Sequence, residues 1–211
     1  MVITLTEARA RKKRDTAGGY QSAVASAIRA LWAGAIDAGQ FSDLMLAAIR
    51  RYLTAAWEAG AADVGVGPDE ITEDERAELE RLIIAEFGYV AKLAADILAG
   101  NRDSGGELAP LTARAAGWAT RYTEVVNTAR TLAGADQRLE WRMGKRKEHC
   151  PDCRRLHGTV KRASTWAKAR ERGLYPQSRA LSCHGYKCGC GLSPTNKRIT
   201  PGPLPRIEGE F

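Results

Sequence analysis

The first two thirds of the chain place their hydrophobic residues three to four positions apart, which is the period of an α-helix. One apolar stripe over 24–35 predicts a helix that ends at Gly39, because glycine is common just after a helix C-terminus. A second stripe begins at Ser42 or Asp43 and predicts a helix that extends to about Gly60.

The clearest helical pattern follows Thr72. Thr72 and Glu75 have the spacing of a capping box, and the stripe behind them predicts one continuous helix that ends at Gly100. After a polar, glycine-rich break, a further stripe over 115–132 predicts another helix, which stops before Gly134.

The period then shortens to two residues. Leu139, Trp141 and Met143 alternate with charged residues, which predicts a short strand with one buried face. From Pro194 on, four prolines and no helical period predict an extended tail.

We therefore predict a mainly α protein in three parts. A helical domain over 1–136 precedes a small, zinc-stabilised α+β module over 137–193, and a proline-rich extended tail occupies 194–211. No run of eighteen apolar residues predicts a membrane span, so no membrane partner is expected. The first residues lack the order of a secretory signal, so we expect the thiols to meet a reducing cytosol.

The zinc prediction rests on the distribution of cysteine and histidine. All five cysteines and all three histidines lie between His149 and Cys190, within 42 of the 211 residues. Zinc prefers sulfur and nitrogen ligands in a tetrahedron, and structural sites commonly supply them as two short pairs. Cys150 and Cys153 have the spacing of one such pair.

The second pair comes from Cys183, Cys188 and Cys190, so five cysteines compete for four places and the sequence leaves the spare one open. His157 and His184 rank below them as ligands. A different interpretation is that all five are free, buried thiols that pack as small hydrophobic side chains. We expect structural zinc, because large apolar residues are few around the cysteines and a core this thin is marginal without a metal.

Charge is divided unevenly along the chain. Residues 141–211 hold 16 Lys and Arg against 5 Asp and Glu, a net charge of +11, whereas residues 1–140 carry −4. Such a region attracts nucleic acid or an acidic protein surface, although it can also be a solvated basic face. The predicted contact residues are Arg142, Lys145, Arg146, Lys147, Arg154, Arg155, Lys161 and Arg162.

No enzymatic activity is predicted. The chain has no P-loop, no G-x-G-x-x-G and no G-x-S-x-G motif, and it has only half of a zinc-deaminase signature. His149 and Cys150 are adjacent, and neighbours in sequence rarely face each other as a base and a nucleophile.

The segments EWRMGKRKEHCPDCRRLHG and YPQSRALSCHGYKCGCGLSP resemble the C-terminal part of tailed-bacteriophage minor head proteins, the Mu F-like head-morphogenesis family. The resemblance covers about 55 residues. Many family members carry a histidine where Cys183 or His184 stands, and a basic residue where Gly189 stands. The matching positions are Trp141, Cys150, Cys153, Pro176, Cys183, Cys188, Cys190 and Leu192.

The resemblance implies a virion protein that is assembled in few copies in the host bacterial cytoplasm. It would lie near the portal or in the capsid interior, with the portal or major capsid protein and packaged double-stranded DNA as partners. A zinc-ribbon-like nucleic-acid-binding regulator is the alternative, and it would need an aromatic or helical reader of sequence. A small zinc-dependent nuclease ranks third, since it would need a separate histidine–carboxylate site.

Overall fold

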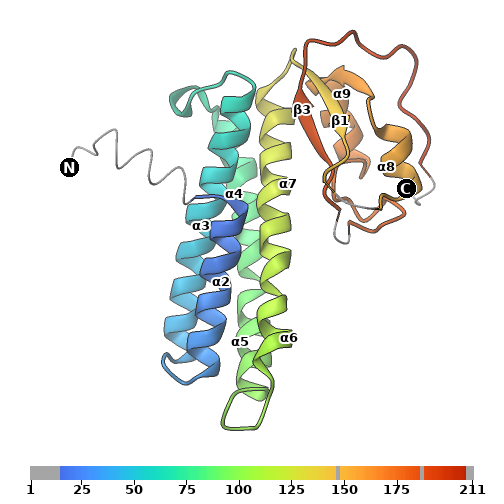
Figure 1. Ribbon diagram of the computed structural model, residues 1–211. Coiled ribbons are helices and arrows are strands. Elements are labelled where there is room, and N and C mark those ends of the chain that lie inside the picture. The colour runs from blue at the N-terminus through green and yellow to red at the C-terminus, as the bar shows by residue number, and fades with distance from the viewer. Residues whose placement is uncertain (1–14, 146–147, 186–187, 208–211) are drawn as a thin grey trace. The chain divides into compact units, whose positions relative to one another are not determined.

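The computed structural model describes residues 15–145, 148–185 and 188–207, and it confirms a mainly α fold with one small sheet. Figure 1 shows the elements in chain order. Their bounds are α2 Ala17–Trp32, α3 Ala38–Asp63, a short 3-10 helix Pro68–Glu70, α4 Glu73–Phe87, α5 Val90–Ala99, α6 Leu108–Ala113, α7 Ala115–Ala133, β1 Arg138–Arg142, α8 Pro151–Leu156, β2 Val160–Arg162, α9 Ala163–Glu171 and β3 Gly191–Pro194.

The described residues divide into two compact units. The helical unit takes them from Met1–Ala56 and Arg76–Tyr122, and the C-terminal unit takes them from Trp57–Glu75 and Thr123–Phe211. This division differs from the predicted boundaries at 136 and 194. The ends of α3 and α7 belong with the C-terminal unit, and so does the tail.

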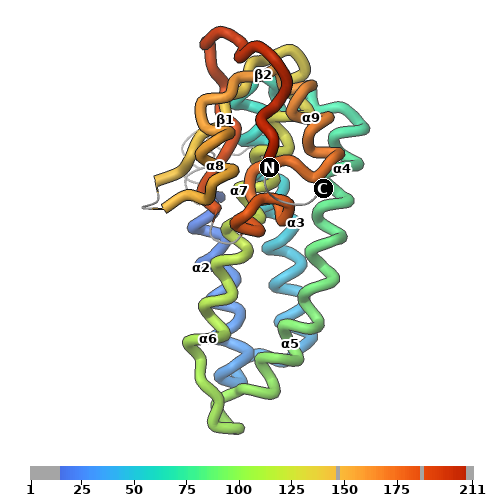
Figure 2. Tube along the Cα trace, turned by 90° about the vertical axis from the view of Figure 1, so that its right-hand side faces the viewer, coloured from blue at the N-terminus to red at the C-terminus, as the bar shows by residue number. Residues whose placement is uncertain are grey.

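In the helical unit, α2 lies side by side with the first part of α3 (Figures 1 and 2). The connection between them corrects the predicted ends: α2 stops at Trp32, and Gly34 takes the left-handed conformation, with φ 70°. Helix α3 begins at Ala38 because Asp37 and Gln40 cap it reciprocally, with N···O distances of 2.8 and 3.0 Å.

The capping box at Thr72 is present. Glu75 N donates to Thr72 Oγ1 over 3.3 Å, and Thr72 N donates to Glu75 Oε2 over 2.8 Å. The single helix predicted behind it is wrong, because the chain leaves the α-helix at Gly88 and Tyr89 and forms α4 and α5. At this break Tyr89 N donates to Glu86 O, three residues back, and glycine is a poor helix former.

The sheet of the C-terminal unit has the strand order β2-β1-β3, with both pairs antiparallel. The predicted strand is β1, and its Leu139 and Trp141 are buried as expected. Its second face is not solvated as predicted, because Glu140 is also buried and its carboxylate pairs with Lys197 and Arg142 at 2.5 and 2.9 Å.

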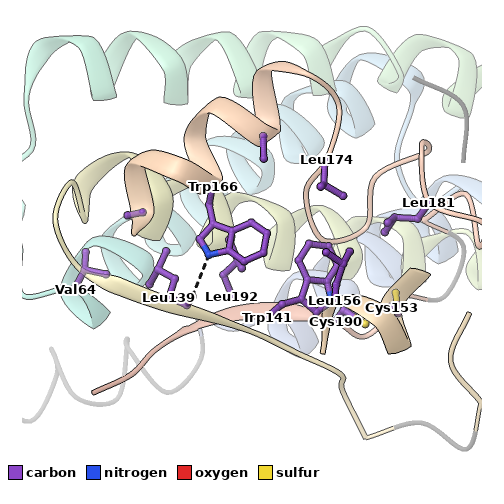
Figure 3. Close-up of a cluster of buried hydrophobic side chains, with 12 residues drawn as sticks. Val64, Leu139, Trp141, Cys153, Leu156, Trp166, Leu174, Leu181, Cys190 and Leu192 are labelled. Carbon is purple, nitrogen blue, oxygen red and sulfur yellow. Dashed lines mark hydrogen bonds between the residues drawn. The ribbon is translucent and has the colours of Figure 1, made fainter. Parts of the chain in front are cut away.

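The hydrophobic core of this unit lies between the sheet and α9 (Figure 3). Trp141 of β1 and Trp166 of α9 pack with ring centroids 5.7 Å apart, and Trp166 Nε1 donates to Leu139 O over 3.0 Å. The sulfurs of Cys153 and Cys190 lie at one end of this cluster, beside Trp141.

Helix α7 also holds the sheet in the C-terminal unit. Asn127 Oδ1 accepts from Leu192 N over 2.9 Å, and Arg130 Nη1 donates to Leu192 O over 2.6 Å. Strand β3, which follows the last cysteine directly, is thereby fixed to a helix.

The tail has no helix among its described residues, but it packs against the C-terminal unit. Thr200 N donates to Val160 O over 2.9 Å, and Val160 N donates to Thr200 Oγ1 over 2.9 Å. Leu204 and Ile207 pack against the hydrophobic core. The tail therefore covers the outer edge of β2, and edge strands commonly need such protection.

Candidate metal centre

The first two cysteines are presented by the start of α8. Cys150 is the N-cap residue, and its Sγ accepts a hydrogen bond from Cys153 N over 3.4 Å. Pro151 occupies the first helical turn, where its missing N–H costs nothing. The Cys-Pro-Asp-Cys sequence therefore folds into a helix start that turns both sulfurs toward one point.

The other three cysteines belong to a tightly wound loop before β3. Gln177 and His184 adopt positive φ angles of 66° and 49°, which are uncommon for residues other than glycine. Gly185 is required by space as well as by its φ of 71°, because a Cβ there would lie 2.1 Å from Gln177 O. Cys188 N donates to Gly185 O over 3.2 Å, which closes a turn just before the last pair.

The structure brings all five sulfurs together around Cys153. The sulfurs of Cys150, Cys153 and Cys183 all lie within 4.8 Å of one another, and so do those of Cys153, Cys188 and Cys190. Cys153 Sγ and Cys188 Sγ are 3.8 Å apart, and none of the five cysteines forms a disulfide. The predicted cysteines therefore form one cluster, which can hold a metal ion.

Backbone amides are directed at these sulfurs. Cys153 N donates to Cys150 Sγ over 3.4 Å. Backbone groups also act to lower thiol pKa values: Gly185 that of Cys183, Gln177 and Cys190 that of Cys188, and Gly144 that of Cys190. Donors aimed at sulfur favour the charged thiolate over the thiol, and the thiolate is the form that binds metal.

The cluster cannot place full negative charge on every sulfur by itself. Hydrogen bonds from Cys153 and Cys190 lower the pKa of the Cys188 thiol to about 2, whereas burial raises that of Cys183 to about 12. The hydrogen bond to Cys188 also raises the pKa of Cys153. Neighbouring thiolates repel one another in a partly buried site, so a bound cation is needed before four of them ionise together.

The sulfur–sulfur distances show whether the cluster can form a tetrahedral zinc site. A zinc ion about 2.3 Å from four sulfurs separates each pair by about 3.8 Å. The Cys153–Cys188 distance equals this value, and within each group of three the sulfur–sulfur distances exceed it by about 1 Å at most. Four ligands must come from both groups, so the binding of one ion requires the two groups to close toward each other around Cys153. The donor set is all sulfur, which suits zinc and other thiophilic ions.

Three polar contacts that the sequence analysis did not identify fix the cysteine segments: two join the α8 turn to the loop before β3, and the third lies within that loop. Asp152, fully buried between the first two cysteines, accepts from Ser182 N over 2.8 Å and also from Ser182 Oγ. Gln177 Nε2 donates to Cys190 O over 2.7 Å. The aspartate inside Cys-x-x-Cys could have been singled out from the sequence, whereas nothing in the sequence marks Gln177.

Close backbone approach adds a further constraint. A Cβ at Gly144 would lie 2.1 Å from Gly189 O, so the chain after β1 runs directly against the Cys-Gly-Cys turn. The backbone of Gly144 accordingly acts to lower the pKa of the Cys190 thiol.

The histidines lie outside both three-sulfur groups of the described chain. His157 is exposed and its Nδ1 accepts from Met143 N over 3.3 Å, while the Nδ1 of the exposed His184 lies 3.1 Å from Arg179 O. Their lower rank as ligands agrees with this placement.

The predicted basic residues separate into three classes. Arg146 and Lys147 lie outside the described residues. Lys161 is buried, and its Nζ donates to Thr200 O and Gly202 O over 2.7 and 2.5 Å, so its prediction as a surface contact is wrong. The exposed residues of the set are Arg142, Lys145, Arg154, Arg155 and Arg162.

Some of these exposed side chains have partners within the protein. Arg142 pairs with Glu140, and Arg162 pairs with Asp136 at 3.2 Å. Arg154 Nε donates to His149 O over 2.9 Å, and this bond holds the Arg154 side chain against the residue before Cys150.

Comparison with known proteins gives no match: no family model, curated protein or solved structure is similar to this chain. Among the described residues, no helix combines the length and the apolar character needed to cross a lipid bilayer.

Proposed function

We propose that the chain is a non-enzymatic structural protein whose C-terminal unit folds around one zinc ion. The observation that carries the proposal is the gathering of five sulfurs around Cys153 from two segments about thirty residues apart, with backbone amides directed at them. Zinc fits because four thiolates complete its tetrahedron and leave no open place for a substrate.

The energetics favour a structural role for the ion. From β1 to β3, the part of the unit that carries the cysteines has three strands of five, three and four residues and two short helices, α8 and α9, which is little regular structure to stabilise it. A structural zinc ion contributes on the order of 10 kcal/mol or more of coupled folding free energy. This contribution is comparable with the whole stability of a typical domain.

We further propose that the protein serves in a tailed-phage virion as a minor head protein, with the portal or major capsid protein as its partner. The support is the resemblance of the cysteine segments to that family, together with the finding that these same segments form one centre. The exposed basic residues are proposed to meet packaged double-stranded DNA without reading its sequence.

The virion role is tested by quantitative mass spectrometry of purified particles. The proposal predicts the protein in mature heads at a few copies per virion, and its retention after the particles are washed in high salt. Absence from purified particles would refute the virion role and leave a nucleic-acid-binding regulator as the next hypothesis, to be tested by its sequence selectivity.

A further inference from the structure

The metal centre contains one more thiol than a tetrahedral ion can bind. This inference rests on the proposed zinc centre and concerns how the extra thiol is used. The described sulfurs form two groups of three, and Cys153 is the member that both groups share.

Cys183 and Cys190 lie in different groups around this common point. Cys183 is grouped with Cys150 and Cys153, whereas Cys190 is grouped with Cys153 and Cys188. Cys150 belongs to the α8 turn, and Cys188 already lies at the tetrahedral distance from Cys153. If Cys150, Cys153 and Cys188 are three of the ligands, either Cys183 or Cys190 completes the four, since each shares a group with Cys153.

Neither of the two has a clear structural advantage as a ligand. Each belongs to one of the two groups of three sulfurs that contain Cys153. Cys190 is fully buried and its carbonyl is held by Gln177, whereas Cys183 is half-buried and adjoins Ser182, which Asp152 holds. Both segments are thus fixed next to the same ion by comparable contacts.

We propose that Cys183 and Cys190 alternate as the fourth ligand of one ion, while Cys150, Cys153 and Cys188 stay bound. In the exchange, the incoming sulfur forms a metal–sulfur bond as the outgoing sulfur breaks its own. The incoming thiol gives up its proton and the outgoing thiolate takes one up, so the charge of the centre is unchanged. The fifth thiol provides an associative route for ligand replacement, which makes the ion bound yet exchangeable.

The experiment uses the full chain and the variants Cys183→Ser, Cys190→Ser and Cys183→Ser/Cys190→Ser. Cobalt(II) is the probe, because its absorption distinguishes four sulfur ligands from three, and native mass spectrometry counts zinc. We expect both single variants to bind one ion with a four-sulfur spectrum, and the double variant to lose that spectrum. Cys153→Ser is the control, because it removes the sulfur that both groups share and should by itself lose the four-sulfur spectrum.

Removal of zinc by a chelator supplies the kinetic readout. Alternation predicts that the ion leaves the wild type faster than it leaves either single variant, because each variant lacks the competing thiol. Loss of the four-sulfur spectrum in only one single variant, equal release rates, or two ions per chain would overturn the inference.

Two further observations separate the possible causes of failure. Cys190→Ala repeats the test with a side chain suited to the buried position, and the near-ultraviolet circular dichroism of the Trp141–Trp166 pair reports folding. A wild type that binds no metal would refute the proposed zinc centre itself. A wild type that binds one ion through a fixed set of four cysteines would refute only the alternation.

Discussion

Gln177 has three roles in the loop that holds the last cysteines. Its backbone has a φ of 66° and helps to lower the pKa of the Cys188 thiol, and its side-chain Nε2 donates to Cys190 O. Sequence alone could not reveal this, because glutamine has no marked preference for the left-handed region. The cysteines, by contrast, were predictable as a group, because soft sulfur ligands at short spacing have a specific chemistry.

Replacement of Gln177 by alanine should weaken the centre. The variant leaves Cys190 O buried without its donor, so we expect a loss of about 1 kcal/mol or more in the free energy of unfolding, and weaker zinc binding. A competitive zinc titration and denaturant unfolding measure the two effects. The exposed Gln137→Ala is the matched control, and an equal effect of both variants would contradict the assigned role.

Glu140 gives the C-terminal unit a pH dependence. Hydrogen bonds from Lys197 and then Arg142 hold the pKa of this carboxyl below its usual value. A carboxyl whose pKa is lower in the folded state stabilises that state above its ordinary pKa, and this stabilisation disappears as pH falls through the lower value.

The Glu140→Gln variant should therefore be less stable than the wild type at neutral pH. The difference between the two proteins should shrink as pH falls below the ordinary pKa of a glutamate toward the lowered pKa of Glu140, because the wild-type carboxyl then becomes protonated as well. Denaturant unfolding at several pH values measures this difference, and subtraction removes the acid sensitivity that the thiolates share in both proteins. A difference that does not change with pH would contradict the argument.

The helices and the central strand were largely predictable because their periods are long and regular, but several ends were not. The Asp37–Gln40 pair that starts α3 has the spacing of a capping box. The apolar stripe begins later in the chain, so the predicted start of the helix was too late. The break between α4 and α5 lies at Gly88 and Tyr89. The sequence did not reveal it, because the hydrophobic pattern continues across the break. The burial of Glu140 could not be predicted, because its partner Lys197 lies in the tail, 57 residues away in the sequence.

Replacement of Gly60 and of Gly117 by alanine distinguishes the effect of close packing on stability from the effect of helix propensity. A Cβ at Gly60 in α3 would lie 2.4 Å from Val126 O of α7, whereas one at Gly117 in α7 meets nothing within 4 Å. We expect Gly60→Ala to destabilise the protein by about 1–3 kcal/mol, because backbone cannot move aside cheaply. Gly117→Ala should stabilise it by about 0.5–1 kcal/mol, because alanine is the better helix former. Thermal unfolding of both variants tests the pair, and equal shifts would contradict the packing argument.

At the scale of the whole molecule, the uneven charge predicts how the protein meets a polyanion. The C-terminal 71 residues carry the excess of positive charge, and five of the eight predicted contact residues are exposed in the structure. Lys161 shows why composition alone overestimates the surface: its ammonium satisfies carbonyls of the tail. The sequence predicted the sign and the region of the charge, but it could not separate exposed cations from those used internally.

If the exposed cations contact DNA phosphates, replacement of Lys145, Arg154 and Arg155 by alanine should reduce the salt dependence of binding. The slope of log affinity against log salt should decrease by about 0.9 for each contact that is lost. Fluorescence anisotropy with double-stranded DNA of two unrelated sequences measures this slope. An unchanged slope, or a preference for one sequence, would contradict a non-specific phosphate contact.

The most direct test of the account is the metal content of the purified protein, followed by chelation. We predict one zinc ion per chain. Its removal should abolish the near-ultraviolet signal of Trp141 and Trp166 and leave most of the helical far-ultraviolet signal in place. A protein that contains no zinc, or one whose tryptophan signal survives complete removal of the ion, would contradict the claim that a metal–thiolate centre folds the C-terminal unit.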